Sequence, residues 1–317
     1  MRCIFIIFTL CALALGCSLA DPARADSLSD AVNSIVAVLP DWPGGYQRQN
    51  SGLEEPEGSA VAVLSDGYLA TNAHVLGRAK RIDIRLADGR LVAAKIIGRD
   101  QRTDIALLKA PINLPISETV PPPPLGERVC AVGNAFGLGI SMTCGVVSAV
   151  NRSNAGFNPV EDFIQTDAAV NPGASGGALV DGKGRLVGLL SAIFTKKSDA
   201  NIGVNFAVSS ALLMRVVKDL RDHGRVQAGW AGWRLTQLNA EARRRQSGVR
   251  VVSVEAGGAA ANAGLRIGDV VTQVAGRAVV LPSDAAAALY LHRPGDAVGV
   301  SLSRDGKSLE FKLRLRP

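Results

Sequence analysis

The chain has 317 residues, which is enough for two domains with a core each. Apolar residues at 47% and charged residues at 20% are typical of a globular protein and exclude an intrinsically disordered one. The whole excess of +7 in formal charge lies in residues 225–317. Such a basic domain suits either an anionic partner, such as the carboxylate end of a peptide, or a solvated basic face. Nucleic-acid binding is not expected, because no recognition motif accompanies the charge.

Residues 1–25 predict an export signal. Arg2 provides a positive start, Cys3–Leu15 is an apolar run, and small residues that fit a cleavage site precede both Asp21 and Asp26. The run is shorter than the about 20 residues that a membrane helix needs, so we expect a periplasmic or otherwise secreted protein. Residues 13–17, which end at Cys17, match a lipoprotein signal only poorly. We therefore expect membrane contact only if the leader is retained or lipidated.

Residues 26–224 are predicted to form one mainly β domain. Short apolar, β-branched runs follow one another, with turn formers such as Asp66-Gly67 and Asp88-Gly89 between them. The runs include Ala60–Leu64, Ile82–Leu86, Leu91–Ile97, Ile105–Leu108, Val129–Val132, Gly145–Val150, Phe163–Gln165, Leu186–Ser191 and Val204–Val208. Closely spaced strands without intervening helices predict a barrel or a sandwich. The first expected helix is Ser209–His223, with serines at its start and Gly224 at its end.

Residues 225–317 are predicted to form a smaller α+β domain. The expected elements are a strand at Val249–Val254, a helix near Ala259–Ala263, a strand at Val270–Val274, a helix near Ser283–His292, and strands at Ala297–Ser303 and Leu309–Leu315. Pro282 before the second helix and Pro294-Gly295 after it mark its ends.

Two of the five cysteines, Cys130 and Cys144, lie beyond the leader. They flank the turn-rich loop Gly133–Gly139 between two strand-like runs. An exported compartment permits a disulfide between them, at the base of a hairpin. Two buried thiols in neighbouring strands are the alternative, and nothing around them suggests metal binding.

Three short segments contain the residue types of a hydrolytic triad. His74 ends Thr71–His74, Asp104 heads a predicted strand, and Ser175 stands among glycines in Gly173–Gly177. A serine hydroxyl is a weak nucleophile at neutral pH and needs an adjacent base that a third group orients. Imidazole can be that base, and a buried carboxylate fixes its tautomer. Taken singly, the segments are equally compatible with a structural histidine, a strand cap and a plain turn.

The glycines around Ser175 allow two backbone N–H groups to converge on one point. By the usual arrangement these groups belong to Gly173 and Ser175, and they would form an oxyanion hole. One such donor can contribute about 2.7–4 kcal/mol to the stability of the transition state.

Longer segments around these residues resemble the HtrA/Deg family of serine proteases. They are Gly58–Val61, Gly67–Val75, Thr103–Lys109, Gly133–Gly139 and Ile164–Gly177. The resemblance covers most of residues 30–220 and implies a chymotrypsin-like double β-barrel with the triad in the cleft between the barrels. It also implies ATP-independent cleavage of unfolded or damaged proteins, and a homotrimer. No cofactor is expected, and with His74 in the triad no histidine cluster remains for a metal ion.

Three positions depart from the family pattern. Ala174 stands where the family has Asn or Asp before the nucleophile, and Ala135 and Ala178 stand where it has proline. Ala174 lacks a side chain that could brace the oxyanion loop. We therefore expect a lower or more regulated activity, not its absence.

The primary specificity pocket is expected to lack an acidic group. By position in the trypsin-like fold, its base falls six residues before the nucleophile, at Ala169. Its walls are expected to come from Ser191, Ala192 and Ile193. Without a carboxylate the pocket should not select Lys or Arg, and small or medium aliphatic side chains suit it better.

The second domain is similar to a PDZ domain in the segments Ser247–Val254, Ala263–Val271 and Val274–Arg277. Such a domain binds an extended peptide by strand addition, which we expect beside the strand that starts at Val249. The N–H groups of Ser247, Gly248 and Val249 would receive the terminal carboxylate of the peptide. Just upstream, Arg243, Arg244 and Arg245 would either attract that carboxylate or form a solvated helix face.

We therefore expect an exported serine endopeptidase of protein quality control, acting on unfolded polypeptides, with a PDZ domain that binds exposed C-termini. Two alternatives remain open. One is a regulatory protease of narrow specificity that peptide binding activates. The other is a chaperone or scaffold with little turnover.

Overall fold

The computed structural model describes residues 22–42, 58–193 and 202–317. The predicted leader lies outside the described residues as far as residue 21, which includes Cys17. Helix α1 (Pro22–Asn33) then leads into the first strand, so the expected cleavage site before Asp26 falls within this helix. In the described part of the chain, no helix is long and apolar enough to cross a membrane.

Six antiparallel strands close into a first barrel, in the order β1-β2-β3-β6-β5-β4. They are β1 (Ile35–Asp41), β2 (Gly58–Leu64), β3 (Tyr68–Asn72), β4 (Arg81–Arg85), β5 (Leu91–Asp100) and β6 (Ile105–Lys109). Small and branched side chains fill the interior, where Val38, Ile84 and Leu108 are completely buried. The short helix α2 (Ala73–Leu76) follows β3 directly.

A second barrel of six antiparallel strands follows, in the order β10-β11-β12-β9-β8-β7. Its strands are β7 (Arg128–Gly133), β8 (Ser141–Arg152), β9 (Phe163–Thr166), β10 (Ala178–Asp181), β11 (Leu186–Ile193) and β12 (Asn205–Ser209). The 3-10 turn η1 (Ala135–Gly137) lies between β7 and β8. A continuous apolar core joins the two barrels, with Val61 and Leu107 from the first packing near Val132 and Phe163 from the second.

Helix α3 (Ser210–His223) closes this part of the molecule, as predicted from its caps. Ser209 Oγ accepts a hydrogen bond from Leu212 N at 3.2 Å, and Gly224 ends the helix in a left-handed conformation. Leu213, Val216 and Leu220 on its apolar face belong to the core between the barrels.

The remaining residues form the predicted smaller α+β domain around a sheet of order β13-β14-β15-β17-β18, with β16 beside β15. Its strands are β13 (Trp233–Gln237), β14 (Val249–Val254), β15 (Val270–Val274), β16 (Arg277–Ala278), β17 (Ala297–Arg304) and β18 (Lys307–Arg314). Its helices are α4 (Ala240–Arg243), α5 (Ala259–Ala263) and α6 (Pro282–Tyr290). A separate core includes Val251, Val274, Val300 and Leu313. The prediction of a double barrel followed by an α+β domain is confirmed.

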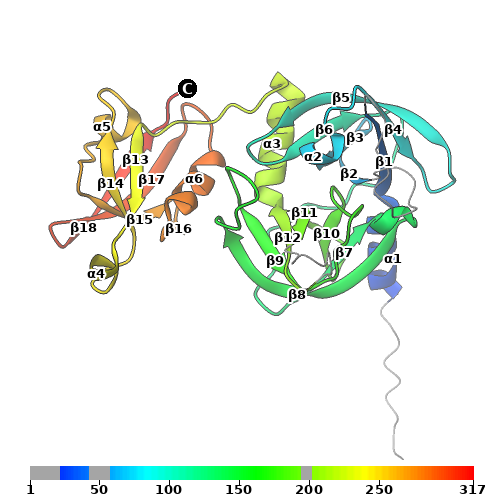
Figure 1. The fold of residues 1–317 in the computed structure, drawn as a ribbon, viewed down its shortest axis with the longest axis horizontal. Coiled ribbons are helices and arrows are strands. Elements are labelled where there is room, and N and C mark those ends of the chain that lie inside the picture. The colour runs from blue at the N-terminus through cyan, green and yellow to red at the C-terminus, as the bar shows by residue number, and fades with distance from the viewer. Residues whose placement is uncertain (1–21, 43–57, 194–201) are drawn as a thin grey trace, which may run out of the picture.

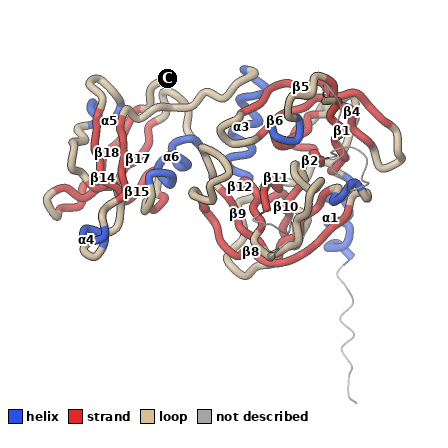
Figure 2. The backbone as a smooth tube through the Cα atoms, in the orientation of Figure 1, coloured by secondary structure: helices blue, strands red, loops and turns tan. Residues whose placement is uncertain are grey.

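The smaller domain presents α6 to the barrels, with α3 between the two parts (Figure 1). Most of the regular structure on both sides of this junction is strand (Figure 2). Polar contacts cross the junction: Arg293 donates to Asp219 on α3 at 2.7 Å, and Arg277 donates to Asp162 at 2.8 Å. The two domains are therefore joined by specific contacts as well as by the chain.

Candidate active site

Ser175 lies in a tight loop between β9 and β10, where the two barrels meet. Residues 171–174 form a turn that a 3.0 Å hydrogen bond from Ala174 N to Asn171 O closes. Proline at the second position and Gly173 at the third, with φ of +92°, are typical of a type II turn. A Cβ on Gly173 would lie 2.4 Å from the carbonyl oxygen of Asn134, so this position requires glycine.

The peptide between Pro172 and Gly173 is oriented by the β7–β8 hairpin. Phe136 N donates to the carbonyl of Pro172 at 2.7 Å. Because a trans peptide holds its C=O and N–H on opposite sides, the N–H of Gly173 points away from that hairpin. Neither this N–H nor that of Ser175 donates to an acceptor within the described residues. Two neighbouring backbone donors are thus available to a bound oxygen atom.

His74 and Asp104 are joined by a short hydrogen bond. His74 Nδ1 lies 2.5 Å from Asp104 Oδ2, and the backbone N of His74 donates to Asp104 Oδ1 at 2.8 Å. The sheet brings them together, because Asn72 at the end of β3 pairs with Ile105 at the start of β6. The Asp104 side chain is 13% exposed and that of His74 is 50% exposed, so the imidazole faces solvent while its partner is sheltered.

Ser175 is linked to this pair through Ser191 and Asn72. Its Oγ donates to the carbonyl of Ser191 at 3.4 Å and forms no hydrogen bond with His74 within the described residues. Asn72 donates through Nδ2 to Ser191 Oγ at 3.4 Å and to Asp104 O at 3.1 Å. The structure therefore closes the histidine–carboxylate link and leaves the serine–histidine link open, as is common without a bound substrate.

Ser59 on β2 braces the serine loop from the first barrel. Its N–H donates to Ser175 O at 2.8 Å, and its Oγ donates to Gly173 O at 2.8 Å. The same Oγ accepts from Asn134 N at 2.8 Å. Ala174 packs into the second barrel and is only 5% exposed. Ser59 thus supplies, from outside the loop, polar support that the Ala174 side chain cannot.

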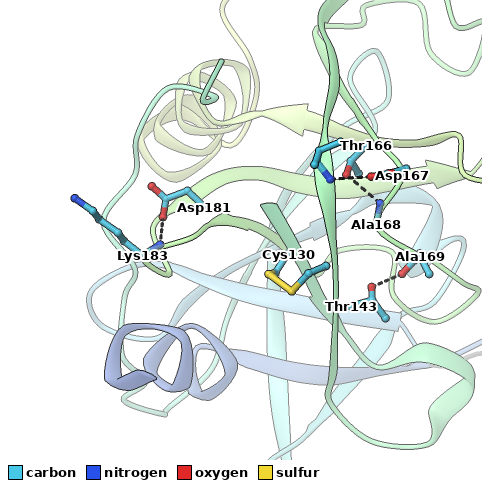
Figure 3. The surroundings of a disulfide bond; sticks show 10 residues. Cys130, Thr143, Thr166, Asp167, Ala168, Ala169, Asp181 and Lys183 are labelled. Carbon is cyan, nitrogen blue, oxygen red and sulfur yellow. Dashed lines mark hydrogen bonds between the residues drawn. A yellow bond between two sulfur atoms is a disulfide. The ribbon is translucent and has the colours of Figure 1, made fainter. Parts of the chain in front are cut away.

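Of the predicted pocket residues, Ser191 is the one that the described contacts place against Ser175. Ser191 is buried, and its carbonyl accepts the hydrogen bond from Ser175 Oγ. Ala169 is exposed, and Thr143 Oγ1 donates to its carbonyl at 2.5 Å (Figure 3). Ala192 and Ile193 end β11, and their side chains lie outside the described part of the structure. Their role in specificity stays a prediction.

Cys130 and Cys144 form a disulfide at the base of the hairpin that orients the serine loop (Figure 3). They are direct partners in the β7–β8 ladder. Cys130 is completely buried. The covalent bond therefore closes the hairpin whose loop places Phe136 against Pro172.

The predicted peptide site beside β14 is wrong. This strand is hydrogen-bonded to β13 on one side and to β15 on the other, so no further strand can be added to it. Val249 pairs with both Gln237 and Val271, and a Cβ on Gly248 would lie 2.5 Å from Val271 O. Gly248 and Val249 are therefore buried against the neighbouring strands, and Ser247 lies exposed just before β14. In the described sheet, the main strand order ends at β13 on one side and at β18 on the other, and the two-residue β16 pairs only with β15.

The three arginines upstream of β14 lie in the connection that contains α4. Arg243 ends α4, and Arg244 and Arg245 continue the turn. Arg245 pairs with Glu241 at 2.9 Å, with both side chains more than 70% exposed (77% and 73%). This arrangement favours a solvated face over capture of a carboxylate.

The comparisons with known proteins agree with this geometry. A trypsin-like peptidase domain matches residues 58–189, and a PDZ domain matches residues 201–315. The solved structure of the HtrA-type protease AlgW with a decapeptide aligns with a TM-score of 0.69 and 33% identity, over 93% of this chain and 99% of that one. The chain belongs to the HtrA family of serine proteases.

Other HtrA relatives give the same result. The solved serine endoprotease from Yersinia pestis aligns with a TM-score of 0.62 and 30% identity, over 92% of this chain and 97% of that one. The periplasmic serine endoprotease DegP of Salmonella typhimurium is 36% identical over 283 residues, which are 86% of this chain. The periplasmic pH-dependent serine endoprotease DegQ of Escherichia coli is 37% identical over 271 residues, which are 81% of this chain. The chain spans 58% and 59% of the length of these two curated relatives.

Several polar residues of this HtrA site were not predicted from sequence. They are Ser59, Asn72 and the buried Asn205, whose Nδ2 donates to Ala168 O at 2.8 Å next to the predicted pocket. Buried polar side chains on strands were the signal available for them, since such groups need partners. Within the described residues, no group of three or more His, Cys, Asp or Glu side chains is placed to hold a metal ion.

Proposed function

We propose that this chain is a serine endopeptidase in which Ser175 is the nucleophile, His74 the general base and Asp104 the residue that orients it. The observation that carries the proposal is the 2.5 Å contact between His74 Nδ1 and Asp104 Oδ2. Asn72 and Ser191 link this pair to Ser175 in its glycine-rich turn. The free N–H groups of Gly173 and Ser175 support it, because they can hold a developing oxyanion.

In this mechanism Ser175 Oγ turns from the carbonyl of Ser191 to Nε2 of His74. Oγ then attacks the substrate carbonyl carbon while its proton passes to Nε2, and Asp104 stabilises the imidazolium that forms. The substrate oxygen takes up the negative charge and is held by the two backbone donors. The imidazolium returns the proton to the leaving amine, and a water molecule repeats the sequence to release the acyl group.

Labelling with a fluorophosphonate probe and digestion of casein test this proposal. The wild-type protein should be labelled and should digest casein, and Ser175→Ala should do neither while keeping its circular dichroism spectrum. Ser308→Ala, which changes an exposed serine on β18 of the smaller domain, is the matched control and should be labelled like the wild type. An unlabelled wild type, or labelling that survives Ser175→Ala, contradicts the assignment.

The proposed substrates are unfolded or damaged polypeptides in the periplasm. The names of the curated relatives and the predicted leader support this compartment. The absence of an acidic residue at Ala169 supports cleavage after small or medium aliphatic side chains. Mass spectrometry of casein fragments measures this preference, and dominant cleavage after Lys or Arg contradicts it.

A second candidate is a regulatory protease that a peptide C-terminus activates, with the peptide adding to the open edge of β13. The observation that favours it is that α6 lies beside this edge and also contacts the barrels. Trp230 and Trp233 lie at the start of β13, so their fluorescence should report binding of a decapeptide with a free carboxylate.

The same decapeptide with an amidated C-terminus is the control for that experiment. An increase in the casein cleavage rate with the free peptide alone identifies the regulatory protease. Peptide binding without a change in rate identifies the general protease. A fluorescence response that is equal for both peptides contradicts recognition of the carboxylate.

A further inference from the structure

The turn that carries Asp104 has a conformation that needs outside support. It connects β5 to β6 through residues 100–104. Asp104 has φ of +59°, in the left-handed region that residues other than glycine adopt rarely. Such a conformation persists only where neighbouring groups hold it. Some of this support comes from Val160, whose N–H donates to the carbonyl of Arg102 at 2.9 Å.

Asp100 is the internal anchor of this turn. The residue is buried, with 8% of its surface exposed. Oδ2 accepts a hydrogen bond of 2.7 Å from the hydroxyl of Thr103, which is completely buried and directly precedes Asp104. The position of the Asp100 carboxylate thus determines where Thr103 lies, and through Thr103 where the chain enters Asp104.

A second donor to Asp100 comes from the PDZ domain. Tyr290, the last residue of α6, donates its hydroxyl to the same Oδ2 at 2.9 Å. Its side chain is part of the apolar core of the barrels, and the residue is 5% exposed. The Arg102 guanidinium lies 5.2 Å from the centre of its ring. Tyr290 belongs to the PDZ domain, but its ring therefore packs in the core of the protease domain, beside the turn that carries Asp104.

The Tyr290 hydroxyl keeps its proton at neutral pH and therefore remains a hydrogen-bond donor. Burial, and next to it the Asp100 carboxylate, raise the pKa of Tyr290 far above its ordinary value. Without this donor the buried carboxylate of Asp100 would lose one of its hydrogen bonds, which is costly for a buried charge. The other side-chain hydrogen bonds between the domains, within the described residues, do not touch residues 100–104. Among them are the bonds that join Arg293 to Asp219, Arg277 to Asp162, Ser153 to Ser283 and Asp284, and Arg215 to the carbonyl of His292.

We propose that Tyr290 is a positioning residue of the protease site: through Asp100 and Thr103 it holds the turn that presents Asp104 to His74. The inference rests on the triad assigned above. In this proposal, the PDZ domain helps to position Asp104 in the protease site of the same chain, with or without a bound peptide.

Tyr290→Phe tests the proposal, because it removes the hydroxyl and keeps the ring in the core. In the full chain, we expect kcat to fall about ten- to a hundredfold with KM unchanged, since the substrate contacts stay in place and only the catalytic geometry shifts. The proton between His74 Nδ1 and Asp104, followed by NMR with ¹⁵N-histidine, should move upfield. Tyr68→Phe is the matched control, since Tyr68 lies on β3 with Lys109 over its ring, and it should change neither value.

Asp100→Asn provides the second arm. If Tyr290 acts through Asp100, Tyr290→Phe should have little further effect on kcat or on the NMR signal in the Asp100→Asn background. Full additivity of the two substitutions overturns the proposal. An unchanged His74 proton signal in Tyr290→Phe also overturns it, and this readout needs no turnover. A wild type that fluorophosphonate does not label would instead overturn the proposed function and leave the NMR test of Tyr290 intact.

Discussion

Gly173 illustrates how a single backbone conformation can determine the chemistry of the whole site. Its positive φ turns the N–H of the preceding peptide away from Phe136, where a substrate oxygen can reach it. The proposed triad residues stand in segments with distinctive local patterns, and the structure brings two of them, His74 and Asp104, together. Ser59 and Asn205 could not be predicted from sequence, because a lone polar residue on an apolar strand forms no periodic pattern, and its partners are distant in sequence.

Gly173→Ala should lower kcat/KM by about a hundredfold or more, because the added Cβ would lie 2.4 Å from Asn134 O and displace an oxyanion donor. Gly126→Ala is the matched control: its φ is +82°, and nothing lies within 4 Å of the added Cβ. It should cost about 1 kcal/mol of stability and leave kcat/KM unchanged. Hydrolysis of a peptide substrate measures both, and equal kcat/KM values in the two variants contradict the assignment of Gly173.

At the scale of elements, the alternation of apolar runs and turn formers was sufficient to predict most strands and α3. The order of strands in the sheet was not predictable in this way. Trp233–Gln237 is a short run in which three of the five residues are basic or polar, so its pattern does not predict a strand. Its presence as β13 moves the open edge away from β14, which is why the predicted PDZ site was wrong. Strand order depends on contacts between distant segments, and local patterns do not contain it.

The β7–β8 hairpin should lose stability when its disulfide is removed. Cys130 and Cys144 are separated by 14 residues in sequence, and closing a loop of this size contributes about 3 kcal/mol in the chain-entropy model. Replacing both cysteines by serine should lower the free energy of unfolding by about that amount, as measured by urea denaturation. Reductant should shift the wild-type midpoint and leave the variant unmoved. A wild-type midpoint that is insensitive to reductant contradicts the prediction.

At the scale of the whole molecule, the two domains share a buried charge. Asp219 on α3 is completely buried and accepts hydrogen bonds from Arg293 and from Gln227 N, and it pairs with Arg215. Burial alone would raise the pKa of Asp219, but these hydrogen bonds outweigh it and hold the pKa below its ordinary value of 3.8. The stability that this group contributes is therefore present above about pH 4 and is lost as the pH falls through the lower native value.

Calorimetry should show the two domains unfolding together at neutral pH and separating once the pH falls below the lowered native pKa of Asp219, where its carboxylate becomes protonated. Asp219→Asn should show the separated transitions already at neutral pH. Asp222→Asn is the matched control on the same helix, since its exposed pair with Arg221 contributes little. A single transition that persists in Asp219→Asn would show that this carboxylate does not couple the domains.

The open edge of β13 has a consequence for solubility. Unpaired backbone groups along an edge strand can bind any extended chain, including the same edge of another molecule. Arg234 on β13 and Arg250 on β14 are both exposed, so two such edges would bring like charges together. The excess of positive charge in this domain therefore disfavours aggregation through β13, while it leaves the edge attractive to a chain that ends in a carboxylate.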